Sequence, residues 1–204
     1  MDVGAFVAAH LPPAPARVLE VGCGRGDLAR SLADAGHAVV AIDPDAPPGD
    51  IFRPVSLEDF DDPERFDAVV AMRSLHHIHD LTGAVAKVAQ LLRPGGRVLV
   101  YEHAWERFDG RTARWYLEQR GGRADAPDAV ERCRVHWTAQ HRGLHTAVAM
   151  RAALDSRFAA RELAWTAYLS DELGPDVTRE EEQRLIEAGT IAATGFFYVG
   201  ERAS

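Results

Sequence analysis

A glycine-rich turn near the N-terminus constrains the fold of this chain more than any other feature. Residues 20–26 read Glu-Val-Gly-Cys-Gly-Arg-Gly; the apolar, β-branched segment 17–21 leads into them and a helical pattern over 28–35 follows. Glycines at such a point let a backbone approach a nucleotide closely and leave amide groups facing it. A strand, a glycine turn and a helix in this order predict the nucleotide-binding unit of an α/β fold.

The rest of the chain continues this alternation of strands and helices. Periodicity predicts helices over 28–35, 80–92, 145–158 and 179–188, and strands over 17–21, 38–42, 66–72, 97–101, 159–169 and 194–199. Segment 104–142 interrupts the alternation with helical, arginine-rich and aromatic-rich sequence that contains no clear strand. The alternation predicts a parallel sheet that is covered by helices on both faces.

Composition favours a single cytoplasmic domain over 1–204. The chain has 204 residues, 47% hydrophobic and 26% charged, and no apolar run is long enough to span a bilayer. The two cysteines, Cys23 and Cys133, carry no metal-ligand spacing and fit a reducing compartment. A net charge of −8 without a separate basic face argues against nucleic acid and anionic membranes as partners.

An acidic residue after the second strand narrows the nucleotide chemistry. Asp43 ends that strand, and its carboxylate is placed to accept hydrogen bonds from both hydroxyls of a ribose. The glycines follow a G-x-G-x-G spacing, whereas the NAD fingerprint requires G-x-G-x-x-G. The spacing therefore argues against a nicotinamide-dependent oxidoreductase.

Three segments together resemble the class I S-adenosylmethionine-dependent methyltransferases. They are the acid-x-Gly-x-Gly-x-Gly turn at 20–26 with Asp43, the segment 66–78, and the turn and strand at 92–100. The resemblance implies a Rossmann-like, doubly wound seven-stranded sheet of order 3-2-1-4-5-7-6, with the last strand antiparallel and 104–142 as a helical insertion after the fifth strand. It also implies an enzyme that transfers a methyl group to an oxygen, nitrogen or carbon atom of a small-molecule acceptor.

The same resemblance assigns a cofactor site. The residues it implies are Glu20, Gly22, Gly24, Gly26, Asp43, Ser56, Leu57, Glu58 and Arg73. Glu20 and the glycine turn would hold the methionine end and the sugar, Asp43 the ribose, and residues 56–58 the adenine. The family often has an Asp where Ser56 stands. The adenine amino group could therefore be bound by Ser56, by Glu58 or by the main chain. Segment 44–54 is too short and proline-rich for the helix usually found there.

Transfer to a hydroxyl or a protonated amine requires a base, and histidine is the side chain most easily poised near neutral pH. The candidate histidines are His76, His77, His103, His136 and His141. His77 and His103 directly follow the fourth and fifth strands, so we predict these two as catalytic. We predict no metal site, because successive side chains of the 76–79 tract point in different directions. Some metal-binding relatives carry a Glu-x-x-Glu-His pattern at this place. The matching positions here are Arg73, His76 and His77, so both carboxylates are missing.

The insertion 104–142 is expected to cap the acceptor site. Its aromatic side chains either pack the inserted helices or, as a group, form flat walls for a ring-bearing acceptor; they are Trp105, Trp115, Tyr116 and Trp137. No Asp/Asn-Pro-Pro-Tyr/Phe pattern, typical of enzymes that methylate planar amino groups in nucleic acid or glutamine, follows the fourth strand. The alternative is a methyltransferase-like subunit that has lost turnover and serves as a binding partner. The intact glycine turn and Asp43 argue against that alternative.

Overall fold

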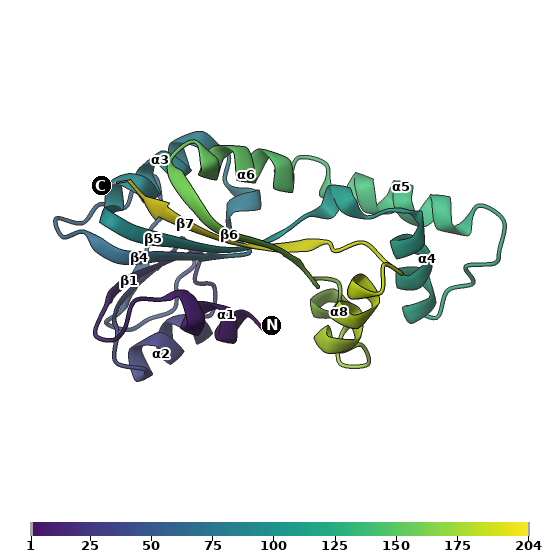
Figure 1. The fold of residues 1–204 in the computed structure, drawn as a ribbon, viewed down its shortest axis with the longest axis horizontal. Coiled ribbons are helices and arrows are strands. Elements are labelled where there is room, and N and C mark those ends of the chain that lie inside the picture. The colour runs from purple at the N-terminus through teal and green to yellow at the C-terminus, as the bar shows by residue number, and fades with distance from the viewer. Residues whose placement is uncertain (1, 204) are drawn as a thin grey trace. The chain divides into compact units, whose positions relative to one another are not determined.

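The computed structural model describes residues 2–203 and confirms the predicted sheet. Its strands are β1 (Arg17–Val21), β2 (Ala38–Asp43), β3 (Phe52–Pro54), β4 (Phe66–Met72), β5 (Leu92–His103), β6 (Phe158–Thr166) and β7 (Gly195–Arg202). They form one seven-stranded sheet in the order β3-β2-β1-β4-β5-β7-β6. The pairs β3–β2, β2–β1, β1–β4 and β4–β5 are parallel. Strand β7 runs antiparallel to its neighbours (Figure 1).

The chain divides into two compact units, described here separately. The first unit comprises residues 2–102, 148–163 and 197–203, and the second comprises residues 103–147 and 164–196. Strands β5, β6 and β7 each contribute residues to both units. Among the described residues, no helix combines the length and the apolar content that crossing a bilayer requires.

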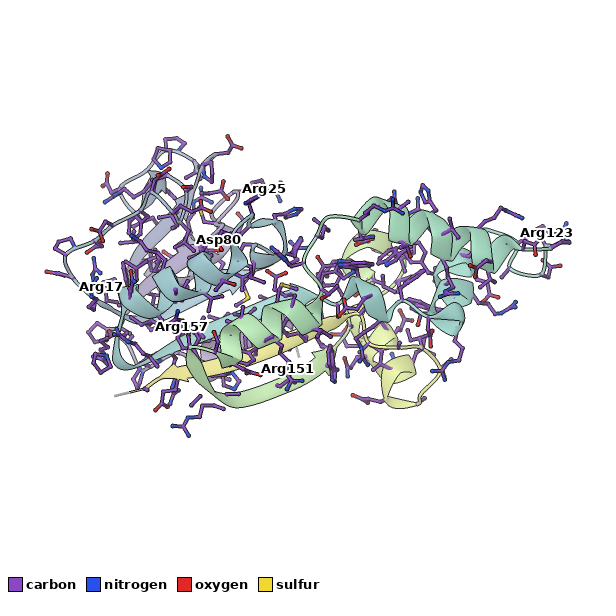
Figure 2. The ribbon with its side chains drawn as sticks, turned by 90° about the horizontal axis from the view of Figure 1, so that it is seen from above. Arg17, Arg25, Asp80, Arg123, Arg151 and Arg157 are labelled. Carbon is purple, nitrogen blue, oxygen red and sulfur yellow. The ribbon has the colours of Figure 1, made fainter. Side chains whose placement is uncertain are left out.

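Helices cover both faces of the sheet in the first unit. Helices α1 (Val3–His10) and α2 (Asp27–Asp34) lie on one face, and α3 (Leu81–Leu91) and α6 (Ala147–Asp155) lie on the other (Figure 1). The continuous apolar run of β4 follows from this arrangement, because its residues from Ala68 to Val70 are fully buried. Asp80, labelled in Figure 2, caps α3 by accepting a hydrogen bond from the Gly83 amide at 2.9 Å.

Helix α1 was not among the predicted elements. The Asp2 carboxylate caps it by accepting a hydrogen bond from the Ala5 amide at 2.8 Å. Its buried Phe6 stacks on Phe197 of β7, with ring centroids 4.3 Å apart. As the sequence predicted, residues 44–51 form turns instead of a helix.

The predicted helical insertion is confirmed in the second unit. It contains the short 3₁₀ helix η2 (Trp105–Arg107), α4 (Gly110–Gln119) and α5 (Ala129–His141), and the same unit holds α7 (Ser170–Leu173) and α8 (Arg179–Glu187). The core of this unit is a cluster of Phe108, Ala113, Tyr116, Trp137 and Leu169. Trp105 and Trp115 are partly buried against it.

This cluster confirms one of the two roles predicted for the aromatic side chains of the insertion, namely that they pack the inserted helices. Trp137 stacks on Phe108 at a centroid distance of 4.2 Å and meets the edge of Tyr116 at 5.5 Å. Trp137 is 3% exposed and Tyr116 is 8% exposed, so both pack in the core of the unit. The physical reason is that the second unit needs an apolar centre of its own for α4 and α5 to pack against. Trp137 and Tyr116 also line a cavity of about 630 Å³ within the second unit, so their role as walls of an acceptor pocket stays a prediction.

Candidate functional site

The glycine turn forms a cradle that only glycine can build. Gly22, Gly24 and Gly26 have φ angles of +74°, +50° and +80°, in the left-handed region that other residues rarely adopt. A Cβ atom on Gly22 would lie 2.5 Å from the Cβ atom of Ser74. A Cβ atom on Gly24 would meet nothing within 4 Å. The turn is therefore packed closely at Gly22 and leaves open space for a ligand beside the backbone of Gly24.

Asp43 connects this turn to the end of β2. One carboxylate oxygen, Oδ2, accepts a hydrogen bond from the Gly24 amide at 3.0 Å, and Oδ1 accepts one from the Asp45 amide at 2.9 Å. The Gly22 and Cys23 amides both donate to the carbonyl of Ile42, at 2.8 and 3.1 Å. Each oxygen of the half-buried Asp43 carboxylate keeps acceptor capacity for a further donor.

A cavity of about 460 Å³ in the first unit brings most of the predicted residues together. Among the predicted residues, those that line it are Gly22, Asp43, Ser56, Leu57, Glu58, Arg73 and His77. The lining also contains residues that were not predicted from the sequence, namely Val21, Ile42, Pro44, Val55, Ser74, Ile78 and His79. Its volume is that of a site for a small molecule or a cofactor.

Glu20 lies beneath the turn, outside the cavity lining. Its side chain is 3% exposed, and its Oε2 atom has no hydrogen-bond partner among residues 2–203. Burial raises the pKa of Glu20 to about 7, and the negative charges of Asp27 and Asp43 add to this effect, while a hydrogen bond from the Ala29 backbone opposes it. A cation near this orphaned oxygen would stabilise the ionised carboxylate.

A buried carboxylate fixes the segment that follows β4. Glu102 is fully buried, and its Oε1 atom accepts hydrogen bonds from the Ser74 amide at 2.7 Å and from the Leu75 amide at 2.5 Å. Its Oε2 atom accepts a hydrogen bond from Nδ1 of His76 at 2.5 Å. Glu102 was not predicted as a site residue, although a charged residue directly after the apolar strand 97–101 is a signal in the sequence.

Of the two predicted catalytic histidines, His77 lines the cavity. Part of its ring is exposed, but burial of the remainder lowers the pKa of His77, and the adjacent His76 lowers it further against the opposing charge of Glu102. A neutral imidazole at neutral pH can accept a proton. His103 is instead buried in the second unit, where it stacks on Tyr168 at a centroid distance of 4.1 Å. It is not among the residues that line this cavity.

Arg73 joins β4 to this segment through an unusual backbone conformation. Its φ angle is +57°, and its amide donates a hydrogen bond to the Tyr101 carbonyl at 2.8 Å. Such a conformation costs a non-glycine residue on the order of 1 kcal/mol and is common at ligand sites. The turn directs the chain from the sheet into the cavity lining formed by Ser74 and His77.

Comparison of the sequence with known proteins identifies relatives. A family model described as a methyltransferase domain matches residues 2–166. The ubiquinone biosynthesis O-methyltransferase of Xanthomonas axonopodis pv. citri (strain 306) is 37% identical over 110 residues, which cover 47% of this chain and 46% of that protein. The match thus spans about half the length of this curated relative.

Solved structures share the fold at low sequence identity. The 1,6-didemethyltoxoflavin-N1-methyltransferase of Burkholderia thailandensis, solved with 1,6-didemethyltoxoflavin and S-adenosylhomocysteine, has a TM-score of 0.61 and 20% identity. That likeness covers 98% of this chain and 76% of the other. The N-methyltransferase NodS of Bradyrhizobium japonicum WM9, solved with S-adenosylhomocysteine, has a TM-score of 0.57 and 14% identity, covering 98% and 82% of the two chains.

Proposed function

Because the chain belongs to the class I methyltransferase domain family, we propose that it is an enzyme that transfers the methyl group of S-adenosylmethionine to a small-molecule acceptor. The observation that carries the proposal is the cavity of the first unit, where Gly22 of the glycine turn, Asp43 and residues 56–58 converge. The curated relatives match only about half of their length to this chain, so the acceptor is proposed by its chemical class alone.

The residues of the first unit fit the cofactor. The charge of the buried Glu20 carboxylate, outside the cavity lining, suits the cationic methionine end, and the open space beside Gly24 admits the cofactor close to the backbone. Asp43 accepts hydrogen bonds from the ribose hydroxyls. The cofactor, when bound, supplies a methyl group that its sulfonium has already activated. The protein therefore needs mainly to position the acceptor and to exclude water.

The adenine amino group is best assigned to Glu58. The hydroxyl of Ser56 already donates to the Asp59 carboxylate at 3.0 Å and accepts from the Asp59 amide at 3.3 Å. Glu58 lines the cavity and is exposed, so its carboxylate is available to a ligand. The buried side chain of Leu57 offers an apolar surface to the adenine ring.

His77 is the proposed general base. It lines the same cavity and is held as a neutral imidazole near pH 7, so a ring nitrogen accepts the proton that a hydroxyl or amine acceptor gives up. The role of His103 as a base stays a prediction. The role of residues 104–142 as the cap of the acceptor site also stays a prediction. The proposed location is the cytoplasm, which suits the two free thiols Cys23 and Cys133.

Calorimetric titration with S-adenosylmethionine and NAD side by side tests the cofactor. We expect binding of the former alone, and binding of NAD alone would overturn the proposal. Incubation with methyl-labelled cofactor and small-molecule metabolite pools then tests turnover. Cofactor binding without label transfer into any pool would favour the alternative of a catalytically silent partner subunit.

A further inference from the structure

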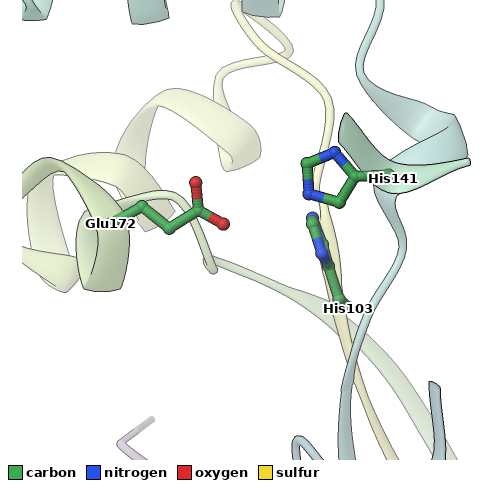
Figure 3. A group of neighbouring side chains, drawn as sticks. All are labelled: His103, His141 and Glu172. Atoms are coloured by element: carbon green, nitrogen blue, oxygen red, sulfur yellow. The ribbon is translucent and has the colours of Figure 1, made fainter. Parts of the chain in front are cut away.

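The second unit holds a cluster of metal-ligating side chains that lies outside the site described above. His103 ends β5, His141 ends α5, and Glu172 belongs to α7. One ligand atom from each of these side chains lies within 4.8 Å of the other two (Figure 3). The three residues are far apart in the sequence, so no local sequence motif predicts that they form a cluster.

We propose that His103, His141 and Glu172 bind a divalent transition-metal ion, with Zn²⁺ the best match. Two imidazoles and one carboxylate are a ligand set typical of zinc sites that keep a fourth position open for water or a substrate atom. Two neutral imidazoles and one carboxylate carry one negative charge, which partly neutralises a dication. The inference does not depend on the proposed methyl transfer.

The imidazole of His141 is arranged as a metal ligand. Its Nδ1 atom lies 2.8 Å from the carbonyl oxygen of Trp137, and because a carbonyl can only accept, Nδ1 carries the proton in this contact. In its neutral form this tautomer carries the metal-binding lone pair on Nε2. Metal-binding histidines are commonly fixed in this way through the second ring nitrogen. Figure 3 shows one nitrogen of the His141 ring on the side that faces His103.

Aromatic side chains hold the His103 ring in place. It is 2% exposed, stacks parallel to Tyr168 at 4.1 Å and meets Trp137 edge-on at 5.4 Å. The rings of His103 and His141 lie edge to face, 4.9 Å apart. Apolar surroundings lower the local dielectric and strengthen the attraction between ligands and a cation.

The segment that carries Glu172 is anchored from α8. The fully buried Glu182 accepts hydrogen bonds from the Tyr168, Leu169 and Ser170 amides, at 2.9, 3.0 and 2.7 Å. These contacts fix both Tyr168, which supports His103, and the start of α7. Hydrogen bonds to an ionised carboxylate are stronger than those between neutral groups, so Glu182 orders the backbone of residues 168–170.

The ligand atoms need to move only a short distance to coordinate zinc. Tetrahedral ligands at about 2.0–2.1 Å from zinc lie roughly 3.3 Å apart, and the ligand atoms of the cluster lie within 4.8 Å of one another, so no gap must close by more than about 1.5 Å. The exposed Glu172 side chain has three rotatable bonds and can supply this movement while its backbone stays in place. The competing explanation is that a proton on one imidazole, in place of a metal, neutralises Glu172.

Metal titration of the full chain separates these explanations. The protein is treated with a chelator, dialysed and titrated with Zn²⁺ in a calorimeter, and Co²⁺ is added in parallel because its visible spectrum reports tetrahedral coordination. We expect about one equivalent of Zn²⁺, and at least about tenfold weaker binding in both His141→Ala and Glu172→Gln. Matched controls are His136→Ala on the same helix and Glu180→Gln on α8, which should bind as the wild type does.

Several outcomes would overturn the proposal. They are no Zn²⁺ binding by the wild-type chain, unchanged binding in both cluster variants, or binding that His79→Ala abolishes, which would move the ion to the 76–79 tract. Glu172 is exposed, so Glu172→Gln keeps the fold and remains decisive if His141→Ala does not fold. Circular dichroism of each variant checks this.

Discussion

Replacing Glu20 with Gln should stabilise the cofactor-free protein at alkaline pH relative to acid pH. The wild-type carboxyl has a pKa of about 7 in the fold, against an ordinary value of 4.5, because it is buried. The folded state therefore binds more protons than the unfolded state between these two values. Stability from this group is fully present below pH 4.5 and is lost as the pH rises through 7. Gln carries no ionisable group, so this loss is absent in Glu20→Gln.

The size of the effect follows from the two pKa values. A difference of about 2.5 pKa units, at 1.36 kcal/mol each, corresponds to about 3 kcal/mol at pH 8 and to almost nothing at pH 4. The buried amide of Gln also leaves polar atoms unpaired, which costs on the order of 1–3 kcal/mol at every pH. The informative quantity is thus the change of the difference with pH, not its value at one pH.

Denaturant unfolding of the wild type and Glu20→Gln at half-unit steps from pH 4 to pH 8.5 measures that change. We expect the stability of the variant relative to the wild type to rise by about 3 kcal/mol over this range. Asp34→Asn, at an exposed acid on α2, is the matched control for an acid-to-amide change and should show no such rise. Parallel stability curves for the wild type and Glu20→Gln would refute the reasoning, because the carboxyl would then not be destabilised by burial.

Three further predictions concern residues that line the cavity of the first unit. Asp43→Asn should weaken S-adenosylmethionine binding at least about tenfold by calorimetry, since it removes charge-assisted hydrogen bonds worth about 1.5–3 kcal/mol each; an unchanged dissociation constant would remove Asp43 from the ribose. Glu58→Gln should weaken the same binding more than Ser56→Ala does, because the Ser56 hydroxyl already donates its hydrogen bond to Asp59. A larger loss in Ser56→Ala would instead assign the adenine amino group to Ser56. His77→Gln should lower turnover about a hundredfold or more and abolish the acidic limb of the pH–rate profile. The lowered pKa of His77 places that limb below its ordinary position near 6.5, and a limb that persists in the variant would dismiss His77 as the base.

The fold was predictable where burial leaves a local trace in the sequence. Strand β4 was predicted at its observed bounds, because a strand buried on both faces reads as a continuous apolar run. Strand β5 was predicted too short, since Pro94, Gly95 and Gly96 are local signals for a turn. In the structure, pairing of Leu92 with Phe66 extends the strand through these residues, with a register shift before Ala68. Long-range pairing there overrides the local preference.

The cofactor residues were predictable because they lie at the ends of consecutive strands. The glycine turn and Asp43 follow β1 and β2, so their meeting is dictated by the parallel sheet. The contact between His76 and Glu102 joins residues 26 positions apart and depends on the side-chain direction at each. The interior role of Trp137 likewise depends on which face of α5 packs inward, and α5 lacks the clear apolar stripe that would have shown this.

The predicted base role of His103 and its proposed role as a metal ligand exclude each other. An imidazole nitrogen that coordinates a metal has no lone pair left to accept a proton, and metal binding requires the neutral ring. Removal of the ion by a chelator therefore separates the two roles in a turnover assay. A free base keeps its activity after chelation and loses it in His103→Ala. A ligand at a site that contributes to turnover loses activity in both, and added Zn²⁺ restores the chelated wild type but not the variant. Activity that survives both treatments would remove His103 from the reaction and leave His77 as the base.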